Sequence, residues 1–424
     1  MLRFLDNLQV VVYIAFILAY AYQLIYLFIG LLGKGPQGKK NAELHRYAVM
    51  IAARNEQTVI GDLIASLKEQ QYPQELMDIY VVADNCTDRT AEVSRKAGAV
   101  VYERFNKRQV GKGYALDYLL HRIFEDCGDQ YYDGFFVFDA DNLVDARFVS
   151  EMNRMFDTGR YVALTSYRNS KNFCDNWITA GYSLWFLREA RYLSQPRAQL
   201  GVNCAISGTG FLVSADVIRE KGGWPYHLLT EDIEFSVSCA VEGRKIGYCG
   251  TAMVYDEQPT EFRQSWDQRL RWSKGFYQIN AHYTGALLRG CARGGRRGAS
   301  CYDMLMTVAP GNLVCVGMVA LFLVVLLSAL WQPAFLVWRA LRLLGHFLAA
   351  TFLGIYKTML LFGFITVLTE WKRIDGAAWK KLMYTFTFPL FMMTYIPISV
   401  AALVSKVEWK PIRHGASQRS RERA

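Results

Sequence analysis

The chain has 424 residues, 52% of them hydrophobic, and a formal net charge of +10; this length is too great for one compact core, so at least two regions are expected. Its basic residues lie beside apolar stretches, which is typical of the cytoplasmic side of a membrane and argues against a nucleic-acid-binding protein. The nine cysteines, an odd number without a Cys-x-x-Cys pair, argue against a disulfide framework or a zinc site.

The first predicted element is a membrane-spanning helix. Residues 8–32 carry no charge and are numerous enough to cross a bilayer. The run is also too long for the apolar region of a signal peptide. Lys34, Lys39 and Lys40 follow it. Because basic loops tend to stay in the cytoplasm, residues 1–41 are expected to form a transmembrane helix and a cytosolic linker.

Residues 42–262 show a different pattern. Short apolar runs end at polar or acidic residues, in RYAVMIAA, DIYVVAD and GFFVFDAD. Helix-like stretches separate them, such as TVIGDLIASLKEQQ and GYALDYLLHRIFE. This alternation predicts an α/β fold, with a mostly parallel sheet and helices on both faces. Ligands of such sheets bind at the carboxyl ends of the strands, so the residues there are candidate site residues.

Two carboxylates end the strand GFFVFDAD. Asp139 and Asp141 are one residue apart, so they point to the same face of an extended chain. At a strand end they can hold a hard divalent cation, with water and substrate phosphates completing its shell. The alternative is an acidic turn that includes Asn142 and Asp145.

Three further polar residues follow predicted strands or precede a helix. Glu56 and Asp84 either belong to helix starts, where Thr87 or Asp88 is the candidate cap, or bond to the base and ribose of a nucleotide. Lys112 lies in a short glycine-flanked loop before a helix. It is either a solvated lysine or a cation that meets a phosphate.

Two acidic residues begin the helix in LLTEDIEF. Glu231 and Asp232 follow Thr230, a candidate cap. They either complement the helix dipole or include a general base, since an ionised carboxylate can accept a proton from an attacking hydroxyl. The glycine-rich turn SGTGFL, at 207–212, is either a bulge or a place where a substrate approaches the backbone.

A cluster of aromatic and cationic residues precedes the later apolar segments, in SWDQRLRWSKGF. Gln268 and Arg271 share one face of a helix. Arg271 can grip a diphosphate, and Trp272 can stack on a sugar ring. The alternative is an interfacial helix with tryptophan at the level of the lipid headgroups. Trp266 and Lys274 are expected to have that interfacial role.

Further apolar stretches are each long enough to cross a bilayer: 304–330, about 346–370 and 382–404. Residues 332–345 hold Arg339 and Arg342, so they form either an interfacial helix or the start of a fourth C-terminal span. Three spans would leave the basic tail outside the cell, against the positive-inside tendency, unless an extra span or a re-entrant segment exists. Pro389 and Pro397 predict a kink in the last segment.

The chain is therefore expected to comprise five regions: 1–41, the N-terminal helix and linker; 42–262, the α/β domain; 263–300, interfacial helices with a basic loop; 301–404, three or four spans; and 405–424, a basic tail.

The ordered motif set resembles the membrane-embedded, inverting glycosyltransferases of family 2. Asp84, Asp139-Ala-Asp141, Thr230-Glu231-Asp232 and Gln268-Arg-Leu-Arg271-Trp272 precede apolar segments. The resemblance covers about residues 45–285 and is to the processive group of cellulose, chitin, hyaluronan, poly-N-acetylglucosamine and nodulation chitooligosaccharide synthases. The chain departs from many relatives in having Asn-Cys-Thr-Asp after Asp84, and it has no recognisable regulatory domain or gating motif. These departures bear on processivity and export more than on catalysis.

The resemblance implies a GT-A fold, which is a Rossmann-like sheet domain, and a role for each matching residue. The residues expected to bind the nucleotide sugar are Ala53, Glu56, Asp84, Lys112, Asp139 and Arg271. Those expected to bind the acceptor are Gly208, Thr209, Gly210, Gln268 and Trp272. Asp232 would be the catalytic base, with Glu231 beside it, and Asp141 with Asp139 would bind Mn²⁺ or Mg²⁺.

The implied activity is transfer of a sugar from a UDP-sugar to a growing chain, giving a β-linked polysaccharide or oligosaccharide. UDP-N-acetylglucosamine is slightly favoured as donor, because the size and short loops resemble those of chitooligosaccharide and poly-N-acetylglucosamine synthases. The alternative is a glycolipid synthase that adds one sugar to a lipid acceptor. The enzyme is expected in the cell membrane as a multi-pass protein with a cytoplasmic catalytic domain. Accessory export proteins are possible partners of such an enzyme. A third hypothesis, a non-catalytic assembly subunit with a decayed active site, is disfavoured because the set of carboxylates is intact.

Overall fold

The computed structural model describes residues 17–309 and 334–407, and isolated helical residues between 10 and 16 and between 317 and 327. An eight-stranded sheet, in the order β3-β2-β1-β4-β7-β6-β8-β5, forms the centre of the α/β domain. The strands are β1 (Tyr47–Ala53), β2 (Met77–Asp84), β3 (Val100–Arg104), β4 (Gly134–Asp139), β5 (Leu143–Val144), β6 (Ala163–Ser170), β7 (Phe211–Ser214) and β8 (Ile246–Asp256).

The predicted α/β class with a mostly parallel sheet is confirmed. The strands β3, β2, β1 and β4 are parallel to one another, and β6 is parallel to β8, whereas β7 is antiparallel to β4 and β6, and β5 is antiparallel to β8. The three strands predicted from apolar runs are β1, β2 and β4, and nearly every residue in them is buried. Strands covered on both faces need continuous apolar runs, which explains why these three were the ones predicted.

Helices cover both faces of the sheet. One face packs against α3 (Ile60–Lys68) and α6 (Phe148–Phe156), with α4 (Thr90–Lys96) beside them. The other packs against α5 (Lys112–Cys127), α7 (Trp177–Glu189), α9 (Ala215–Lys221) and α10 (Glu231–Glu242). A short 3-10 turn, η1 (Gln74–Leu76), precedes β2. The register of β1 sets Ala53 opposite Ala83 and Ala52 opposite Asp139, so the carboxyl ends of β1, β2 and β4 lie together.

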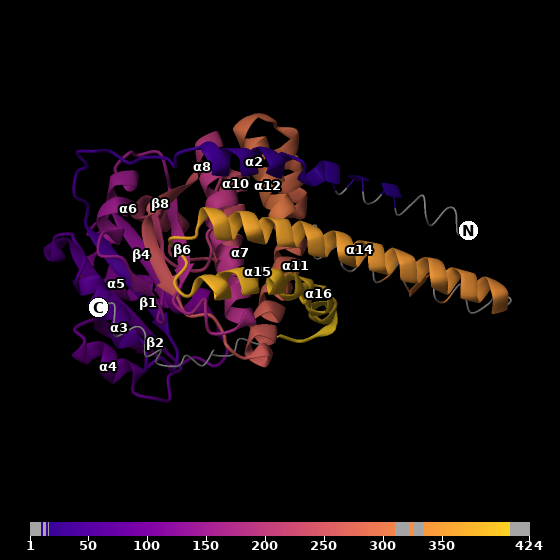
Figure 1. Cartoon of the computed structure of the whole chain (residues 1–424). Helices are drawn as coiled ribbons and strands as arrows, with labels where there is room; N and C mark the ends of the chain where they lie inside the picture. The colour runs from indigo at the N-terminus through magenta and orange to yellow at the C-terminus, as the bar shows by residue number, and fades with distance from the viewer. Residues whose placement is uncertain are drawn as a thin grey trace.

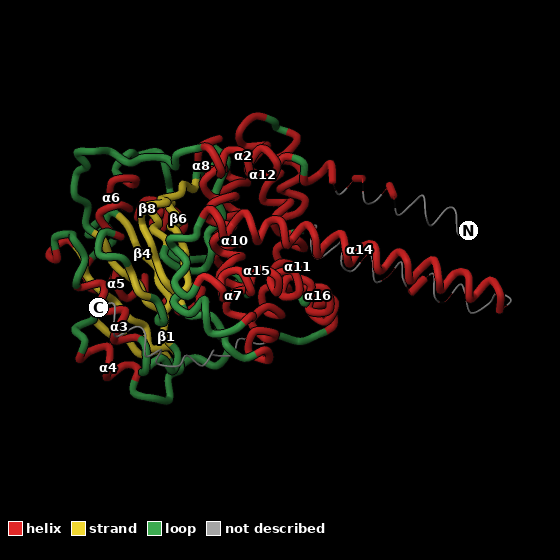
Figure 2. The backbone as a smooth tube through the Cα atoms, in the orientation of Figure 1, coloured by secondary structure: helices red, strands yellow, loops and turns green. Residues whose placement is uncertain are grey.

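A helical part adjoins the α/β domain, with the strands on one side of the molecule and these helices on the other (Figure 2). It comprises α2 (Tyr22–Leu32), the π-helical turn η2 (Ala190–Ser194), α8 (Gln195–Leu200), α11 (Phe262–Ala292), α12 (Gly295–Val308), α14 (Ala334–Thr369), α15 (Ala378–Met393) and α16 (Tyr395–Val404). The orange helix α14 extends well beyond the rest of the molecule, whereas α16 stays beside α11 (Figure 1).

Two helical stretches of the described chain are long and apolar enough to cross a membrane: Leu348–Thr369 and Ala378–Val404. The apolar helix at Ile17–Leu32 is shorter. The first residues of the span predicted at 304–330 form the end of α12. Most of its remaining residues, and the tail after residue 407, lie outside the described residues. Residues 334–345 are the beginning of α14 and not a separate interfacial helix.

The predicted kink in the last apolar segment is present. Helix α15 ends at Met393, and α16 starts at Tyr395. Pro397 has no N–H to donate to the preceding turn, which favours a break here. The buried Arg269 of α11 donates to the carbonyl of Phe391 at 3.3 Å and also to the hydroxyl of Thr394. A cation of α11 therefore holds the bend in place.

Candidate active site

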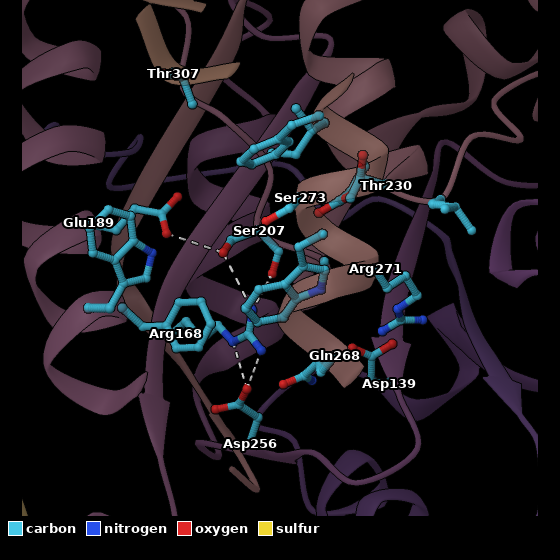
Figure 3. Close-up of a pocket in the computed structure, with 18 of the residues that line it drawn as sticks. Asp139, Arg168, Glu189, Ser207, Thr230, Asp256, Gln268, Arg271, Ser273 and Thr307 are labelled. Atoms are coloured by element: carbon cyan, nitrogen blue, oxygen red, sulfur yellow. Dashed lines mark hydrogen bonds and ion pairs between the residues drawn. The ribbon is translucent and has the colours of Figure 1, made fainter. Parts of the chain in front are cut away.

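A cavity of about 690 Å³ lies at the carboxyl ends of β1, β2 and β4 and continues between the helices. Asp139, Gln268 and Arg271 lie towards one end, Ser207 and Glu189 in the middle, and Thr307 at the other end (Figure 3). Twelve of the fourteen predicted site residues line it: Ala53, Glu56, Asp84, Lys112, Asp139, Asp141, Gly208, Glu231, Asp232, Gln268, Arg271 and Trp272.

The loops after β1 and β2 form the end of the cavity at which nucleotide binding was predicted. Asp84 is 5% exposed and accepts a hydrogen bond from Arg104 at 2.6 Å. At the start of the helix after β2, the side chain of Asp88 accepts a hydrogen bond from the backbone N–H of Thr90 at 3.0 Å. Asp84 is therefore not needed as a cap, and Thr87 does not cap this helix.

Two asparagines that the sequence reasoning missed shape these loops. Asn55 and Asn85 have φ angles of 60° and 53°, a left-handed conformation that asparagine tolerates better than most residues. The side chain of Asn55 accepts from the backbone N–H of Thr87 at 2.8 Å, and that of Asn85 accepts from Asn106 at 3.0 Å. The loops that border the cavity are thereby fixed to each other and to the loop after β3.

Lys112 is held within the cavity wall and is not a solvated lysine. It is the first residue of α5, after Gly111 with a φ angle of 143°. Its ammonium group forms an ion pair with Asp139 and donates to the carbonyl of Gly208 at 2.7 Å. Burial alone would lower the pKa of Lys112, but the charges of Asp139 and Glu231 raise it overall. A firmly charged lysine thus lies at the end of β4.

The Asp139–Asp141 turn is braced from behind. The backbone N–H of Asp139 donates to the hydroxyl of Thr209 at 2.9 Å, and that hydroxyl donates to the side chain of Asn142. The N–H of Gly210 donates to the carbonyl of Val137 at 2.9 Å. Thr209 and Gly210 are not among the residues that line the cavity, so their position suits support of the turn, while Gly208 faces the cavity.

Asp139 and Asp141 suit a divalent cation. They present carboxylate oxygens, which hard cations prefer, to a cavity end where carboxylates outnumber cationic side chains. Asp141 is 6% exposed and accepts from the backbone N–H of Glu257 at 3.1 Å, which orients it. Within the described residues no group of three or more His, Cys, Asp or Glu side chains could hold a metal ion. Phosphate oxygens of a substrate and water would therefore complete the shell.

Glu231 and Asp232 start α10, where Glu231 is buried and Asp232 is partly exposed to the cavity. Burial, and then the charge of Asp232, raise the pKa of Glu231 to about 7. Burial also raises the pKa of Asp232, against hydrogen bonds from backbone N–H groups at the helix start. Gly208 has a φ angle of 79°, and a methyl group there would lie 3.7 Å from Oδ2 of Asp232. Asp232 thus faces the glycine turn across the cavity.

The predicted face of α11 points into the site. Arg271 lies near Asp139 and Gln268 (Figure 3), and burial lowers its pKa against the opposing charges of Glu231 and Asp139. Trp272 packs edge-on against Tyr182, with ring centroids 5.8 Å apart, and leaves part of its ring on the cavity. Arg271 and Trp272 therefore line the cavity, and their predicted contacts with substrate stay predictions. Lys274 donates to the carbonyl of Ala402 at 3.0 Å, at the end of the apolar helix α16, and its predicted interfacial role also stays a prediction.

Sequence reasoning missed a polar network in the middle of the cavity. Arg168 of β6 forms an ion pair with Asp256 of β8 and donates to the carbonyl of Ser207 at 2.7 Å. The hydroxyl of Ser207 bonds to Glu189 at 3.4 Å (Figure 3). The guanidinium of Arg168 also lies 3.7 Å from the ring centroid of Phe186. Asp256 ends an apolar strand as Asp84 and Asp139 do, and that signal could have identified it.

Comparison with known proteins gives a family. The family described as "Glycosyltransferase like family 2" matches residues 45–275. A beta-monoglucosyldiacylglycerol synthase of Synechocystis sp. is 28% identical over 240 residues, which cover 55% of this chain and 48% of the relative. A poly-beta-1,6-N-acetyl-D-glucosamine synthase of Staphylococcus epidermidis is 22% identical over 246 residues, 57% of each chain. The matches span about half the length of these curated relatives.

Structural comparison gives the same fold. A mannosyltransferase from Pyrobaculum calidifontis, solved in complex with GDP-Man and Mn²⁺, superposes with a TM-score of 0.57 and 15% identity over 92% of this chain and 96% of that one. This similarity shows the GT-A-like fold of the α/β domain together with its helices. Since the family match covers more than half of the sequence and includes every predicted site residue, the chain belongs to glycosyltransferase family 2.

Proposed function

We propose that this protein is a membrane-bound, inverting enzyme that transfers one sugar from a UDP-sugar to the hydroxyl group of a lipid. The observation that carries this proposal is the single cavity that joins Asp139 and Asp232 to an apolar region lined by α2, α7 and α14. A sugar donor at the strand ends and a lipid between the helices would meet at Asp232.

A lipid acceptor has more support than the growing polysaccharide expected from the motifs. The 28% identical relative is named for a glycolipid product, whereas the polysaccharide synthase is 22% identical. The same comparison moves the favoured donor from UDP-N-acetylglucosamine to UDP-glucose. The polymer synthase is retained as the second candidate, because its match covers a similar share of the chain.

In the proposed reaction Asp232 takes the proton of the acceptor hydroxyl as its oxygen attacks C1 of the sugar. The bond between C1 and the diphosphate oxygen breaks on the opposite face, so an α-linked donor gives a β-linked product. Lys112 and Arg271 lie near the carboxylates of Asp139 and Glu231, where they would balance the charge of the departing UDP. Mn²⁺ or Mg²⁺ bound by Asp139 and Asp141 would neutralise the diphosphate further.

Contacts between the domains support a cytoplasmic position for the catalytic domain. The turn between α14 and α15 lies on the sheet, where Tyr167 donates to Glu370 at 2.6 Å and Asn169 donates to the carbonyl of Arg373 at 2.9 Å. Lys372 and Arg373 of this turn follow the candidate span that ends at Thr369. Basic turns stay on the cytoplasmic side, so the attached catalytic domain would be there too.

The test is product analysis with the full chain in lipid nanodiscs, supplied with Mn²⁺ and either UDP-glucose or UDP-N-acetylglucosamine. A single addition to a lipid, seen by mass spectrometry, is expected with UDP-glucose. Asp232→Asn should lose transfer while still binding UDP-sugar, and Asp216→Asn, whose side chain is 84% exposed in the unchanged protein, is the matched control. A ladder of saccharides and no glycolipid would replace this proposal with the polymer synthase.

A further inference from the structure

The cavity has an arm that the transfer reaction described above does not use. Beyond Ser207 it runs between α2, α7, η2, α12 and α14, and most of its wall is apolar: Leu24, Trp185, Leu193, Met306, Met359 and Phe362. The exception that stands out is Arg188, the next-to-last residue of α7. A cationic side chain in an apolar cleft among these helices needs an explanation.

Arg188 is buried without an acidic partner. It is 8% exposed, and one terminal nitrogen donates to Gln23 at 3.1 Å. Its Nε is buried and has no hydrogen-bond partner, and no carboxylate of the described residues lies within ion-pair distance. The guanidinium lies 5.2 Å from the ring centroid of Trp185 and 5.1 Å from that of Phe362. These contacts hold the group in place, and the charge of Glu189, the next residue, favours its ionised form without forming an ion pair with it.

The neighbouring arginines show the contrast. Arg197 forms two hydrogen bonds with Asp303, at 2.7 and 2.9 Å, and Arg168 pairs with Asp256. Burial lowers the pKa of Arg188 to about 10, and it therefore still carries its charge at neutral pH. A buried charge without a partner costs free energy, and an anionic ligand would recover that cost.

Arg188 also lies close to the proposed chemistry. It adjoins Glu189, which bonds to Ser207, and Ser207 precedes the Gly208 that faces Asp232. The donor diphosphate has its own cations, Lys112 and Arg271, at the other end of the cavity. The anion that Arg188 suits is thus part of the acceptor and not of the donor.

We propose that this arm binds an anionic acceptor lipid, with Arg188 contacting the phosphate diester of its headgroup and a headgroup hydroxyl lying at Asp232. This rests on the proposed function and narrows its substrate class from any membrane lipid to a hydroxyl-bearing phospholipid. The new bond joins the headgroup oxygen to C1 of the sugar, UDP leaves, and the hydroxyl proton passes to Asp232. Apolar walls then receive the acyl chains, and Arg188 selects the charged headgroup over neutral diacylglycerol.

The test compares two acceptors in nanodiscs of phosphatidylcholine, using the full chain, Mn²⁺ and UDP-glucose. Phosphatidylglycerol and diacylglycerol are supplied separately, and glycolipid products are measured by mass spectrometry. The unchanged protein should have the higher kcat/KM with phosphatidylglycerol. Arg188→Gln should lower the ratio of the two kcat/KM values by about tenfold or more, mainly through KM, because it removes a hydrogen bond to a charged group.

Arg188→Lys should recover part of the preference, since it keeps the charge but loses the planar donor pair. Arg147→Gln, at a position with a side chain 65% exposed, is the matched control and should keep the full ratio. Inorganic phosphate and glycerol phosphate are added to the unchanged protein, and only glycerol phosphate should compete with the lipid. Equal or better use of diacylglycerol by the unchanged protein would overturn this inference while leaving the proposed function in place. Extension of saccharides without any lipid product would remove the proposed function itself.

Discussion

The ammonium group of Lys112 forms an ion pair with the carboxylate of Asp139. Its second hydrogen bond goes to the carbonyl of Gly208, so one side chain joins the start of α5, the end of β4 and the glycine turn. The pairing balances the charge of Asp139, and it places Lys112 at the strand end where the proposed donor diphosphate would bind. Binding of the donor would draw Lys112 towards the phosphates and release Asp139 for the divalent cation.

The first prediction concerns the effect of removing the charge of Lys112 on catalysis. Lys112→Met should lower kcat by about 100-fold or more, the usual cost of removing one group that stabilises developing negative charge. The donor should also bind more weakly, which calorimetry with UDP would measure. Lys96→Met, at a side chain 76% exposed on α4, is the matched control. Unchanged UDP release in the Lys112 variant would exclude a role for this cation in the leaving step.

The pH dependence of the reaction depends on the two acids at the start of α10. Glu231 has a pKa of about 7, and Asp232 also has a raised pKa, with burial as the largest cause for each. A general base must be deprotonated to act, so the enzyme loses activity as the pH falls through the pKa of that base. We therefore expect kcat/KM to decline on the acid side of neutrality. The charge of Asp232 raises the pKa of Glu231, so Glu231 takes up its proton first as the pH falls. Glu231→Gln should therefore leave the decline set by Asp232 in place. A decline that moves with this substitution would show that Glu231, and not Asp232, limits the reaction on the acid side.

Much of the candidate site could be predicted because it follows a local rule. The acids Asp84 and Asp139 end apolar strands, and parallel strands bring their carboxyl ends together. The bracing of Asp139 by Thr209 could not be predicted in this way, because it joins residues 70 positions apart. The antiparallel insertion of β7 between β4 and β6 creates that contact, and no motif records it.

The polar residues in the middle of the cavity were missed for another physical reason. Arg188 and Glu189 lie in α7, whose sequence WITAGYSLWFLRE was not recognised as a separate feature, and nearly all of its residues are buried. A helix surrounded on all sides has no amphipathic stripe to mark its inner face. Its position is determined by packing against β6, α14 and α15, which are distant in sequence.

Metal dependence gives the next prediction. Removal of divalent cations by a chelator should abolish transfer, and added Mn²⁺ or Mg²⁺ should restore it, because the carboxylates around Asp139 and Asp141 would otherwise repel the diphosphate. Asp141→Asn should raise the Mn²⁺ concentration needed for half-maximal activity by roughly tenfold, in keeping with the loss of one charged oxygen ligand. Asp216→Asn should leave that concentration unchanged. Full activity in the presence of chelator would show that Lys112 and Arg271 suffice.

The last prediction concerns the side of the membrane on which α16 ends. Tyr277 of α11 donates to the carbonyl of Ser399 at 3.0 Å, and Lys274 donates to that of Ala402. Lys274 is three residues after Arg271, so the end of α16 lies close to the level of the active site. After Thr394 the chain lies against α11. We expect α15 and α16 to form a re-entrant segment, and Lys406 to stay in the cytoplasm as the positive-inside tendency requires.

Labelling with a membrane-impermeant maleimide checks this arrangement. A cysteine introduced by Ser405→Cys should react in inverted vesicles, which expose the cytoplasmic face, and should stay unlabelled in intact cells. Lys96→Cys on the catalytic domain is the matched reference for the same side, and the unchanged chain gives the background of its own cysteines. Labelling of position 405 only in intact cells would mean that the segment Ala378–Val404 crosses the bilayer completely. In that case the contacts of Lys274 and Tyr277 with α16 could not exist in the membrane, because α11 and the end of α16 would lie on opposite sides.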